Sequence, residues 1–239
     1  MKLEEKIIKW IQSQVKKTKS KGIILGMSGG IDSAVVAILA KKAMNENVLG
    51  IIMPCESNPK DEKDALLISS LFKIKTQIIK LDNIYHSLLP ILPNGNKLSL
   101  ANLKPRLRMI ILYYFANNFN YLVAGTGNKS EIMTGYFTKY GDGGIDILPI
   151  GGLLKTEIKE LSKNLKIPKE IIEKAPSAGL WENQTDEKEL GITYKKLDKT
   201  ITLLKKNQKE KIPQNLLLKI TNLIESSKHK RSLPKIFKP

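Results

Sequence analysis

Apolar residues recur along the chain with two periods, one typical of helices and one of buried strands. Near the start, Leu3, Ile7, Ile11 and Val15 fall every four residues among charged neighbours, which predicts an amphipathic helix. Four short, almost continuous apolar runs predict buried strands. These runs lie at residues 22–25, 48–53, 76–81 and 121–124.

Helical patterns stand between these predicted strands. They cover residues 34–40, 59–71 and 103–114. Pro59 suits the first turn of its helix. Strands that alternate with helices predict a parallel, doubly wound α/β sheet, and such sheets bind ligands beyond the carboxyl ends of their strands. Glycine turns at 26–30 and 125–128 fall at these ends.

The chain of 239 residues is long enough for one α/β domain with a helical appendage. We expect a single domain over residues 1–239, with an α/β core at 1–150 and a mainly helical part at 151–239. Residues 90–99 predict a loop because they are rich in Pro, Asn and Gly. Residues 135–152, rich in Gly and Asp, are either a mobile segment of an active site or a simple connection.

A glycine-rich turn directly follows the first predicted strand. Residues 26–33 read GMSGGIDS, and the helical pattern begins at once. Gly29 and Gly30 let the backbone approach a phosphate closely, the helix start offers free N–H groups, and Ser28 and Ser33 add hydroxyl donors. The Gly-Lys-Ser/Thr of a P-loop and the glycine pattern of a dinucleotide fold are both absent. The turn therefore predicts a phosphate-binding loop of another kind.

Asp32 is the unexpected residue of this loop. A carboxylate beside a bound anion would repel it, so Asp32 makes best sense as a ligand of a magnesium ion that the phosphates share. In the structural alternative, Asp32 or Ser33 merely caps the helix after a glycine turn. Residues 28–33 match SGGxDS, and in this strand–turn–helix context they resemble the signature of the PP-loop ATP pyrophosphatases, which cleave ATP between the α and β phosphates.

Charge and cysteine content narrow the function classes. The net charge is +17, yet only three of the forty basic residues are arginine and the lysines are scattered, so we expect no specific nucleic-acid partner. The single cysteine, Cys55, excludes an intramolecular disulfide framework and a cysteine-rich metal site. The chain shows neither an apolar run of membrane length nor a signal sequence, so we expect a cytoplasmic protein without a membrane partner.

Five further segments resemble ammonia-dependent NAD synthetases, in order and in spacing. They read GTGNKSE at 125–131, TGYFTKYGDGGIDILPI at 134–150, LLKTEI at 153–158, PSAGLWENQTDEKELGITY at 176–194 and HKR at 229–231. The resemblance implies ATP-driven amidation of deamido-NAD, nicotinic acid adenine dinucleotide, through an adenylated carboxylate, with release of AMP and pyrophosphate. It also implies a homodimer and a Rossmann-like fold of the adenine-nucleotide alpha-hydrolase kind, with a five-stranded, mainly parallel sheet.

The resemblance also assigns residues to ATP and magnesium. It makes Asp32 and Glu131 the metal ligands, and it makes both catalytic together with Lys155, which balances the phosphates. By themselves, Glu131 would be an ordinary first-turn carboxylate and Lys155 a solvated lysine. The implied ATP contacts are Gly26, Met27, Ser28, Gly29, Gly30, Ile31, Asp32, Ser33, Thr126, Lys155 and Ser177.

A second set is implied for deamido-NAD. It comprises Arg106, Lys139, Asp146, His229 and Lys230. Arg106 offers a planar fork to a carboxylate or phosphate, whereas Arg108 lies two residues further along the helix and is expected to face elsewhere. Asp142 is a weaker candidate for binding ammonium or taking a proton, because an aspartate flanked by glycines is more often a turn residue.

The chain departs from the family pattern at three positions. Pro105 stands where many relatives have alanine, and a proline bends the approach to Arg106. Ser177 keeps the hydroxyl of their threonine, whereas Gly179 removes a carboxylate that many of them carry. Glutamine-dependent relatives have an extra glutaminase domain with a catalytic cysteine, for which 239 residues with one cysteine leave no room. Ammonia, direct or delivered by a separate protein, is therefore the implied nitrogen donor.

Two other classes of protein stay open on the sequence. A PP-loop RNA-modifying enzyme would share residues 28–33 and profit from the basic charge. Such thiolases usually need extra cysteines or an RNA-binding domain, and the segment at 134–150 would have no explanation. The second class is a non-catalytic protein that binds nucleotides or nucleic acid. AMP formation that depends on both deamido-NAD and ammonium would separate all three.

Overall fold

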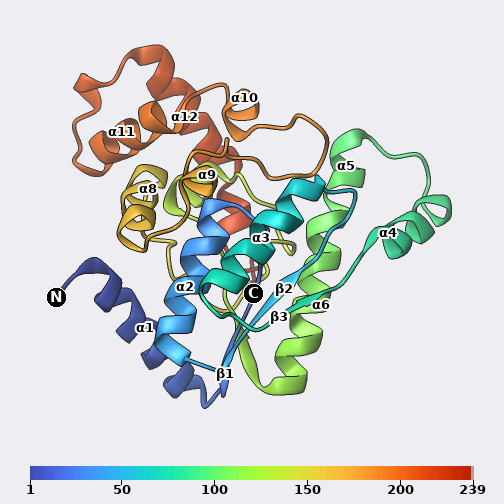
Figure 1. The fold of residues 1–239 in the computed structure, drawn as a ribbon. Helices are drawn as coiled ribbons and strands as arrows, with labels where there is room; N and C mark the ends of the chain where they lie inside the picture. The colour runs from blue at the N-terminus through green and yellow to red at the C-terminus, as the bar shows by residue number, and fades with distance from the viewer. Residues whose placement is uncertain (238–239) are drawn as a thin grey trace.

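A four-stranded parallel sheet forms the centre of the molecule in the computed structural model, which describes residues 1–237 (Figure 1). The strands are β1 (Gly22–Gly26), β2 (Val48–Ile52), β3 (Thr76–Ile78) and β4 (Tyr121–Val123), in the order β3-β2-β1-β4. Ile24 of β1 pairs with Leu49 on one side and with Val123 on the other. The parallel sheet expected from the sequence is confirmed.

The prediction of five strands is wrong for residues 1–237. After β4 the chain meets the sheet again where Ala124 and Ile147 form one isolated parallel bridge, which is too short to be a strand. Asp146 explains the interruption, because its Oδ2 accepts the Val123 N–H at 2.8 Å. A side chain thus takes a donor that the backbone of a fifth strand would use. β3 is also shorter than its predicted run, which extended to residue 81.

Helices connect the strands and then form a group of their own. Up to β4 these are α1 (Leu3–Thr18), α2 (Ile31–Met44), α3 (Pro59–Leu71), α4 (Asp82–Leu88), η1 (Leu89–Ile91), α5 (Lys97–Ala101) and α6 (Leu103–Phe119). After β4 come α7 (Lys129–Thr134), α8 (Lys155–Asn164), α9 (Lys169–Ile172), α10 (Asp186–Leu190), α11 (Tyr194–Lys205), η2 (Lys209–Lys211), α12 (Gln214–Ser226) and η3 (Lys228–Arg231). The predicted helices near residues 3–15, 59–71 and 103–114 are confirmed, whereas the predicted loop at 90–99 contains the start of α5.

The two faces of the sheet carry different helices because side chains alternate along β1. Ile23 and Leu25 pack in one core with α1, α2, α3 and α8. Ile24 packs in a second core with α4 and α6 on the opposite face. In α2, Ile31 and every residue from Ser33 to Ala40 are buried, and this stretch of the helix is accordingly apolar on all sides. This packing holds the start of α2, and therefore the glycine turn before it, in one place.

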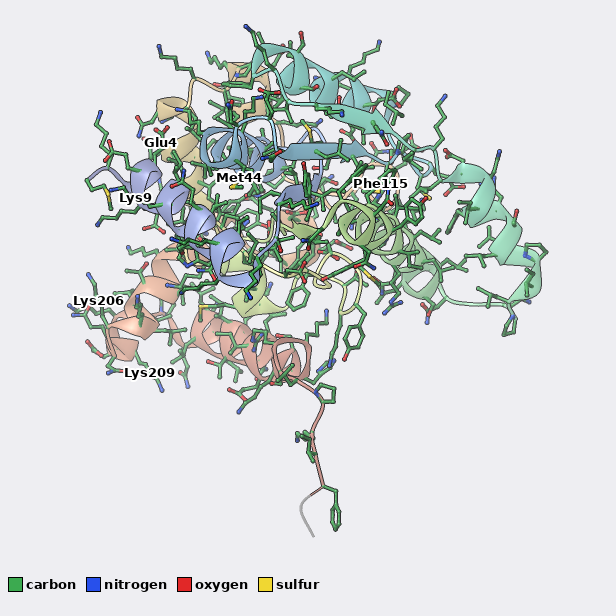
Figure 2. The ribbon with its side chains drawn as sticks, turned by 90° about the horizontal axis from the view of Figure 1, so that it is seen from below. Glu4, Lys9, Met44, Phe115, Lys206 and Lys209 are labelled. Carbon is green, nitrogen blue, oxygen red and sulfur yellow. The ribbon has the colours of Figure 1, made fainter. Side chains whose placement is uncertain are left out.

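The last part of the chain builds a third core. Apolar residues of α11 and α12 pack together with Met133 in α7 and with Tyr136 just after it. Between α9 and α10, residues 173–185 have neither helix nor strand, and we call this segment the strap. Lys206 and Lys209 lie at the outer end of this part and Lys9 lies on α1, all exposed (Figure 2). Within residues 1–237, the helices are too short or too polar to span a bilayer.

Candidate active site

A cavity of about 480 Å³ opens beyond the carboxyl ends of β1, β2 and β4, where a parallel α/β sheet binds ligands. Its walls come from the loop at 26–33, the start of α3, one side of α6, the turn after β4 and the strap. Every residue predicted to contact ATP lines this cavity except Gly29. Residues 155 and 177, far from the loop in sequence, are thus brought to the same space as the loop.

The loop at 26–33 has a backbone that requires glycine. Gly29 has a φ of +73°, and a Cβ there would lie 2.2 Å from the carbonyl oxygen of Asp61. The Oγ of Ser33 donates to the Gly30 carbonyl at 2.9 Å, which turns the serine back onto the loop. α2 begins after Gly30 without a side-chain cap. The structural alternative, in which Asp32 or Ser33 caps the helix, is therefore wrong, and the first N–H groups of α2 face the cavity region without an internal partner.

Lys155 lies between the carboxylates of Asp32 and Glu131. Its Nζ forms an ion pair with Asp32 Oδ2 and lies 3.2 Å from Glu131 Oε1. The side chains of Lys155, Asp32 and Glu131 are 10%, 17% and 15% exposed, so the pairs are poorly screened by water. The three residues come from the first turns of α2, α7 and α8. The geometry brings together the three residues that the sequence resemblance had grouped.

This buried group carries excess negative charge. Burial raises the pKa of Glu131 to about 7, Lys155 opposes the rise, and the nearby Asp32 adds to it. Burial lowers the pKa of Lys155, but its two carboxylate partners outweigh that effect and raise the pKa above its ordinary value. Lys155 is therefore a permanent cation, and it does not fully balance the two carboxylates beside it.

Asn128 ties the two glycine turns together. Its Oδ1 accepts the Glu131 N–H at 3.0 Å, while Glu131 Oε2 accepts the Asn128 N–H at 3.2 Å, a reciprocal cap that orients Glu131 at the start of α7. The side-chain amide of Asn128 also donates to Asp32 Oδ1 at 3.3 Å. Sequence reasoning missed this residue, although the spacing of Asn128 and Glu131 is the signal of a capping box.

Asp186 and Tyr194 form a further part of the site that sequence reasoning missed. The Tyr194 hydroxyl lies 2.9 Å from Asp186 Oδ2 and 3.4 Å from Glu131 Oε1. Asp186 is 3% exposed, and its Oδ1 has no hydrogen-bond partner within residues 1–237. Burial raises the pKa of Asp186, and Lys155 opposes the rise. Both residues lie in the segment at 176–194 that resembles the family, but nothing in that segment distinguished them from their neighbours.

Lys174 of the strap contacts the loop at 26–33. Its Nζ forms ion pairs with Asp61 at 2.7 Å and with Asp64, both in α3, and donates to the Gly29 carbonyl at 3.3 Å. Desolvation lowers the pKa of Lys174, but the two carboxylates raise it above its ordinary value. One lysine thus joins the strap, α3 and the loop, a contact between distant segments that local sequence patterns do not signal.

The residues predicted for deamido-NAD divide into two groups. Lys230 lines the cavity and donates to the carbonyls of Gly135 and Phe137 at 2.7 and 2.9 Å. The others do not line it. Arg106 and Lys139 lie next to each other, since Arg106 donates to the Lys139 carbonyl at 3.4 Å and Lys139 Nζ donates to the His229 carbonyl at 2.8 Å. Asp146 accepts from Val123 and, at 3.0 Å, from the Tyr113 hydroxyl.

The expectation that Arg108 faces away from the site is wrong. Arg108 lines the cavity, where its Nε donates to the Met53 carbonyl at 3.1 Å and a terminal nitrogen donates to Ser57 Oγ at 3.3 Å. Two residues apart on a helix, Arg106 and Arg108 do lie on different sides. The sequence pattern could not decide which side of α6 meets the cavity, because that depends on how α6 packs on the sheet.

The structure explains the residues at positions 142 and 179. Asp142 lies in a turn, as expected for an aspartate flanked by glycines, and its Oδ1 accepts the Thr138 N–H at 2.8 Å. It also lines the cavity, and burial raises its pKa. Gly179 has a φ of +61°, a conformation that other residues rarely adopt. The glycine at this position therefore suits the local backbone of the strap.

The fold and the cavity together define a class of protein: a parallel α/β protein with a glycine loop and a cavity at the carboxyl end of its first strand. Comparison with known proteins gives the family. The NAD synthase family model matches residues 3–234, and the chain belongs to this family.

Individual relatives agree with this assignment. A curated NH(3)-dependent NAD(+) synthetase of Carboxydothermus hydrogenoformans is 55% identical over 199 residues, which is 81% of this chain and 82% of that protein. An NMN synthetase structure from Francisella tularensis superposes with a TM-score of 0.90 at 36% identity, covering 98% of this chain and 96% of that one. An NH3-dependent NAD synthetase structure from Campylobacter jejuni gives a TM-score of 0.86 at 34% identity, covering 98% and 97%.

Proposed function

We propose that this chain is an ammonia-dependent NAD synthetase, which amidates deamido-NAD with ammonia and converts ATP to AMP and pyrophosphate in the last step of NAD biosynthesis. The observation that carries this proposal is the buried group of Asp32, Glu131 and Lys155 at the mouth of the loop at 26–33. It combines phosphate donors, two hard oxygen ligands and a fixed cation in one cavity. Family membership and the curated relatives support the same activity.

The reaction explains why such a site is needed. A carboxylate does not react with ammonia until one of its oxygens becomes part of a good leaving group. A carboxylate oxygen of the nicotinate ring attacks the α phosphorus of ATP, and the bond to the β phosphate breaks. Ammonia then attacks the carboxyl carbon of the adenylate, loses a proton and expels AMP. The site must hold the triphosphate, neutralise pyrophosphate and exclude water from the mixed anhydride.

The described residues fit these tasks. The first N–H groups of α2 would hold the departing pyrophosphate, together with the Ser28 hydroxyl, whereas Ser33 donates its own hydroxyl proton to the Gly30 carbonyl. The Lys155 ammonium would balance its charge, and Thr126 and Ser177 would contact ATP from the opposite wall. We place the reacting carboxylate of the substrate and the α phosphate near Lys155, because its ammonium would offset the negative charge that develops there as pyrophosphate leaves.

Magnesium fits the same group of residues. Asp32 and Glu131 offer carboxylate oxygens, the ligands that magnesium prefers, and they already hold a cation, the Lys155 ammonium, between them. Within residues 1–237 no three His, Cys, Asp or Glu side chains gather as a complete metal-binding set, so oxygens of the triphosphate would supply the other ligands. The ion would supply charge neutralisation at the α and β phosphates.

The residues predicted to bind deamido-NAD form two groups, and we infer that each group binds one end of this substrate. Lys230 and Asp142 lie in the cavity, where we assign them to the nicotinate end and to ammonium. Arg106, Lys139 and His229 lie together outside it, where they would bind the remaining, anionic part of the dinucleotide, with Asp146 on the ribose. This extension would be shaped by a second subunit, so we propose a homodimer acting in the cytoplasm.

The decisive experiment measures products with purified protein, ATP and magnesium. AMP and pyrophosphate should form only when deamido-NAD and ammonium are both present. With heavy oxygen in the nicotinate carboxylate, label should appear in AMP and in the NAD amide but not in pyrophosphate. ADP and labelled inorganic phosphate would refute the proposal, and AMP formation on RNA without deamido-NAD would favour an RNA-modifying enzyme.

A mononucleotide substrate is the second candidate. The structural match to an NMN synthetase has a TM-score of 0.90, and the same amidation applied to nicotinic acid mononucleotide would give NMN. The proposed reaction needs only the nicotinate end in the cavity, so both substrates fit the chemistry. The ratio of kcat/KM for deamido-NAD and the mononucleotide decides between them. We expect deamido-NAD to be preferred, because the curated relatives at 44–55% identity carry the NAD synthetase name.

A further inference from the structure

Lys104 is a buried lysine that the proposed chemistry does not use. It stands at the start of α6 and is 3% exposed. Its Nζ donates to the Leu180 carbonyl at 2.9 Å and forms an ion pair with Glu56 Oε2 at 2.8 Å. The ammonium also lies 5.2 Å from the centre of the Tyr85 ring. Lysine is almost never fully buried unless its charge is paired, so these partners explain why it is tolerated there.

The two polar partners of Lys104 belong to two different walls of the cavity. Glu56 lies in the loop between β2 and α3, and its neighbours Met53, Pro54 and Ser57 line the cavity. Leu180 lies in the strap, which lines the cavity from Lys174 to Trp181. The ammonium group of Lys104 therefore joins two loops that are far apart in sequence but face the same nucleotide site.

Both loops depend on side chains for their position. Glu56 has a φ of +48°, a conformation that residues other than glycine rarely adopt. Its backbone N–H donates a hydrogen bond to Asp82 Oδ1 at 2.7 Å. Its other carboxylate oxygen pairs with His86 at 2.9 Å. The strap has no helix or strand. Besides the contact with Lys104, Gln184 Oε1 accepts the Leu180 N–H at 2.7 Å, and Lys97 lies 4.4 Å from the Trp181 ring centre.

We propose that Lys104 is a positioning residue that fastens the strap to the Glu56 loop, so that Ser177 and the walls around it stand ready for ATP. The proposal rests on the proposed function for the identity of the nucleotide. Lys104 does not line the cavity itself, and it acts on ATP only through the loops that it holds. Its loss should therefore raise the KM for ATP and leave kcat at saturating ATP nearly unchanged.

The two tryptophans of the chain make the proposed role of Lys104 testable. They are Trp10 in α1 and Trp181 in the strap, so in a Trp10→Phe background the emission reports the strap alone. In that background, Lys104→Met should make Trp181 about twofold or more accessible to acrylamide without ATP, and should raise the KM for ATP about tenfold. Lys104→Arg keeps the charge and the donors and should restore both values. Lys188→Gln, an exposed lysine of α10, is the matched control.

The outcomes separate the possibilities. Unchanged quenching and unchanged KM in a folded Lys104→Met protein overturn the proposal, and so does a fall in kcat without a change in KM. If Lys104→Met does not fold, Glu56→Gln removes the charge of the other partner and should raise the quenching of Trp181 by itself, and no rise overturns the proposal. The quenching measurement needs no turnover, so it remains informative even if the protein does not make NAD.

Discussion

At the scale of single residues, the site is dominated by an imbalance of buried charge. Asp32 and Glu131 face the single ammonium of Lys155, and each side chain is at most 17% exposed. Carboxylates held this close together repel each other and favour any added cation. The same pair would repel a triphosphate that arrives without metal. Under the proposed function we therefore expect nucleotide binding to depend on a divalent cation.

Removing either carboxylate tests the metal assignment. Asp32→Asn and Glu131→Gln should each reduce AMP formation by about 100-fold or more, because each loses a charged oxygen ligand of the ion. The control is Glu160→Gln in α8, whose side chain is 71% exposed. Circular dichroism and thermal unfolding should show the variants folded. Near-normal turnover of both variants at saturating magnesium would contradict the assignment.

The pKa of Glu131 gives the site a pH dependence. Burial raises this pKa to about 7 in the metal-free protein, so below pH 7 the carboxyl binds a proton that magnesium, if bound as proposed, would have to displace. Magnesium affinity should therefore fall as the pH drops through 7, and binding should release close to one proton near pH 6 and almost none near pH 8.5. Calorimetry in two buffers of different ionisation enthalpy measures the protons released. Equal release at both pH values would contradict the prediction.

At the scale of elements, the conformation of the loop at 26–33, the proposed phosphate-binding loop, depends on how α2 and α3 pack beside it. Apolar residues bury α2 against the sheet, and Lys174 joins α3 to the loop, because it pairs with Asp61 and Asp64 and donates to the Gly29 carbonyl. The Gly29 backbone passes so close to Asp61 that no side chain fits. The packing of α2, α3 and the strap, rather than the loop residues alone, therefore sets the loop conformation that we propose receives the phosphates.

Two glycine substitutions separate this effect from a general loss of stability. Gly29→Ala would place its Cβ 2.2 Å from the Asp61 carbonyl at a φ of +73°, so it should destabilise the fold by roughly 1–3 kcal/mol and weaken ATP binding at least about tenfold. Gly152→Ala would meet no atom within 4 Å and should change stability by less than about 0.5 kcal/mol. Thermal unfolding and nucleotide titration measure both. Equal ATP affinity of the two variants would contradict the role of Gly29.

At the scale of the whole molecule, one face of α6 is available for a partner subunit. Ile110 and Tyr114 are 56% and 64% exposed and lie one helical turn apart. α6 also carries Arg106, which belongs to the group of residues outside the cavity. Covering this face with a second copy would bury apolar area and bring that copy close to the proposed second end of the dinucleotide.

Charged substitutions on α6 test the homodimer. Ile110→Lys with Tyr114→Lys should give a monomer in analytical ultracentrifugation, because two charges would have to be desolvated at the interface. Deamido-NAD should then bind about tenfold or more weakly if the second subunit shapes its site. The control is Leu218→Lys, since Leu218 is also exposed, at 63%, but lies on α12. A dimer that persists in the double variant would place the interface elsewhere.

The sequence by itself determined the elements and the local chemistry of the loop. Helices α1, α3 and α6 and the parallel strands follow from apolar periodicity, and GMSGGIDS predicts a phosphate site at the end of β1, because all of these depend on neighbours within a few residues. The resemblance grouped Asp32, Glu131 and Lys155, but only the tertiary structure brought their side chains into contact. Only the tertiary structure shows a single bridge at Ile147 in place of the expected fifth strand. It also shows that Arg108, and not Arg106, lines the cavity, and that Lys104 contacts two loops that are distant in sequence. Such contacts depend on how whole elements pack, which no local pattern encodes.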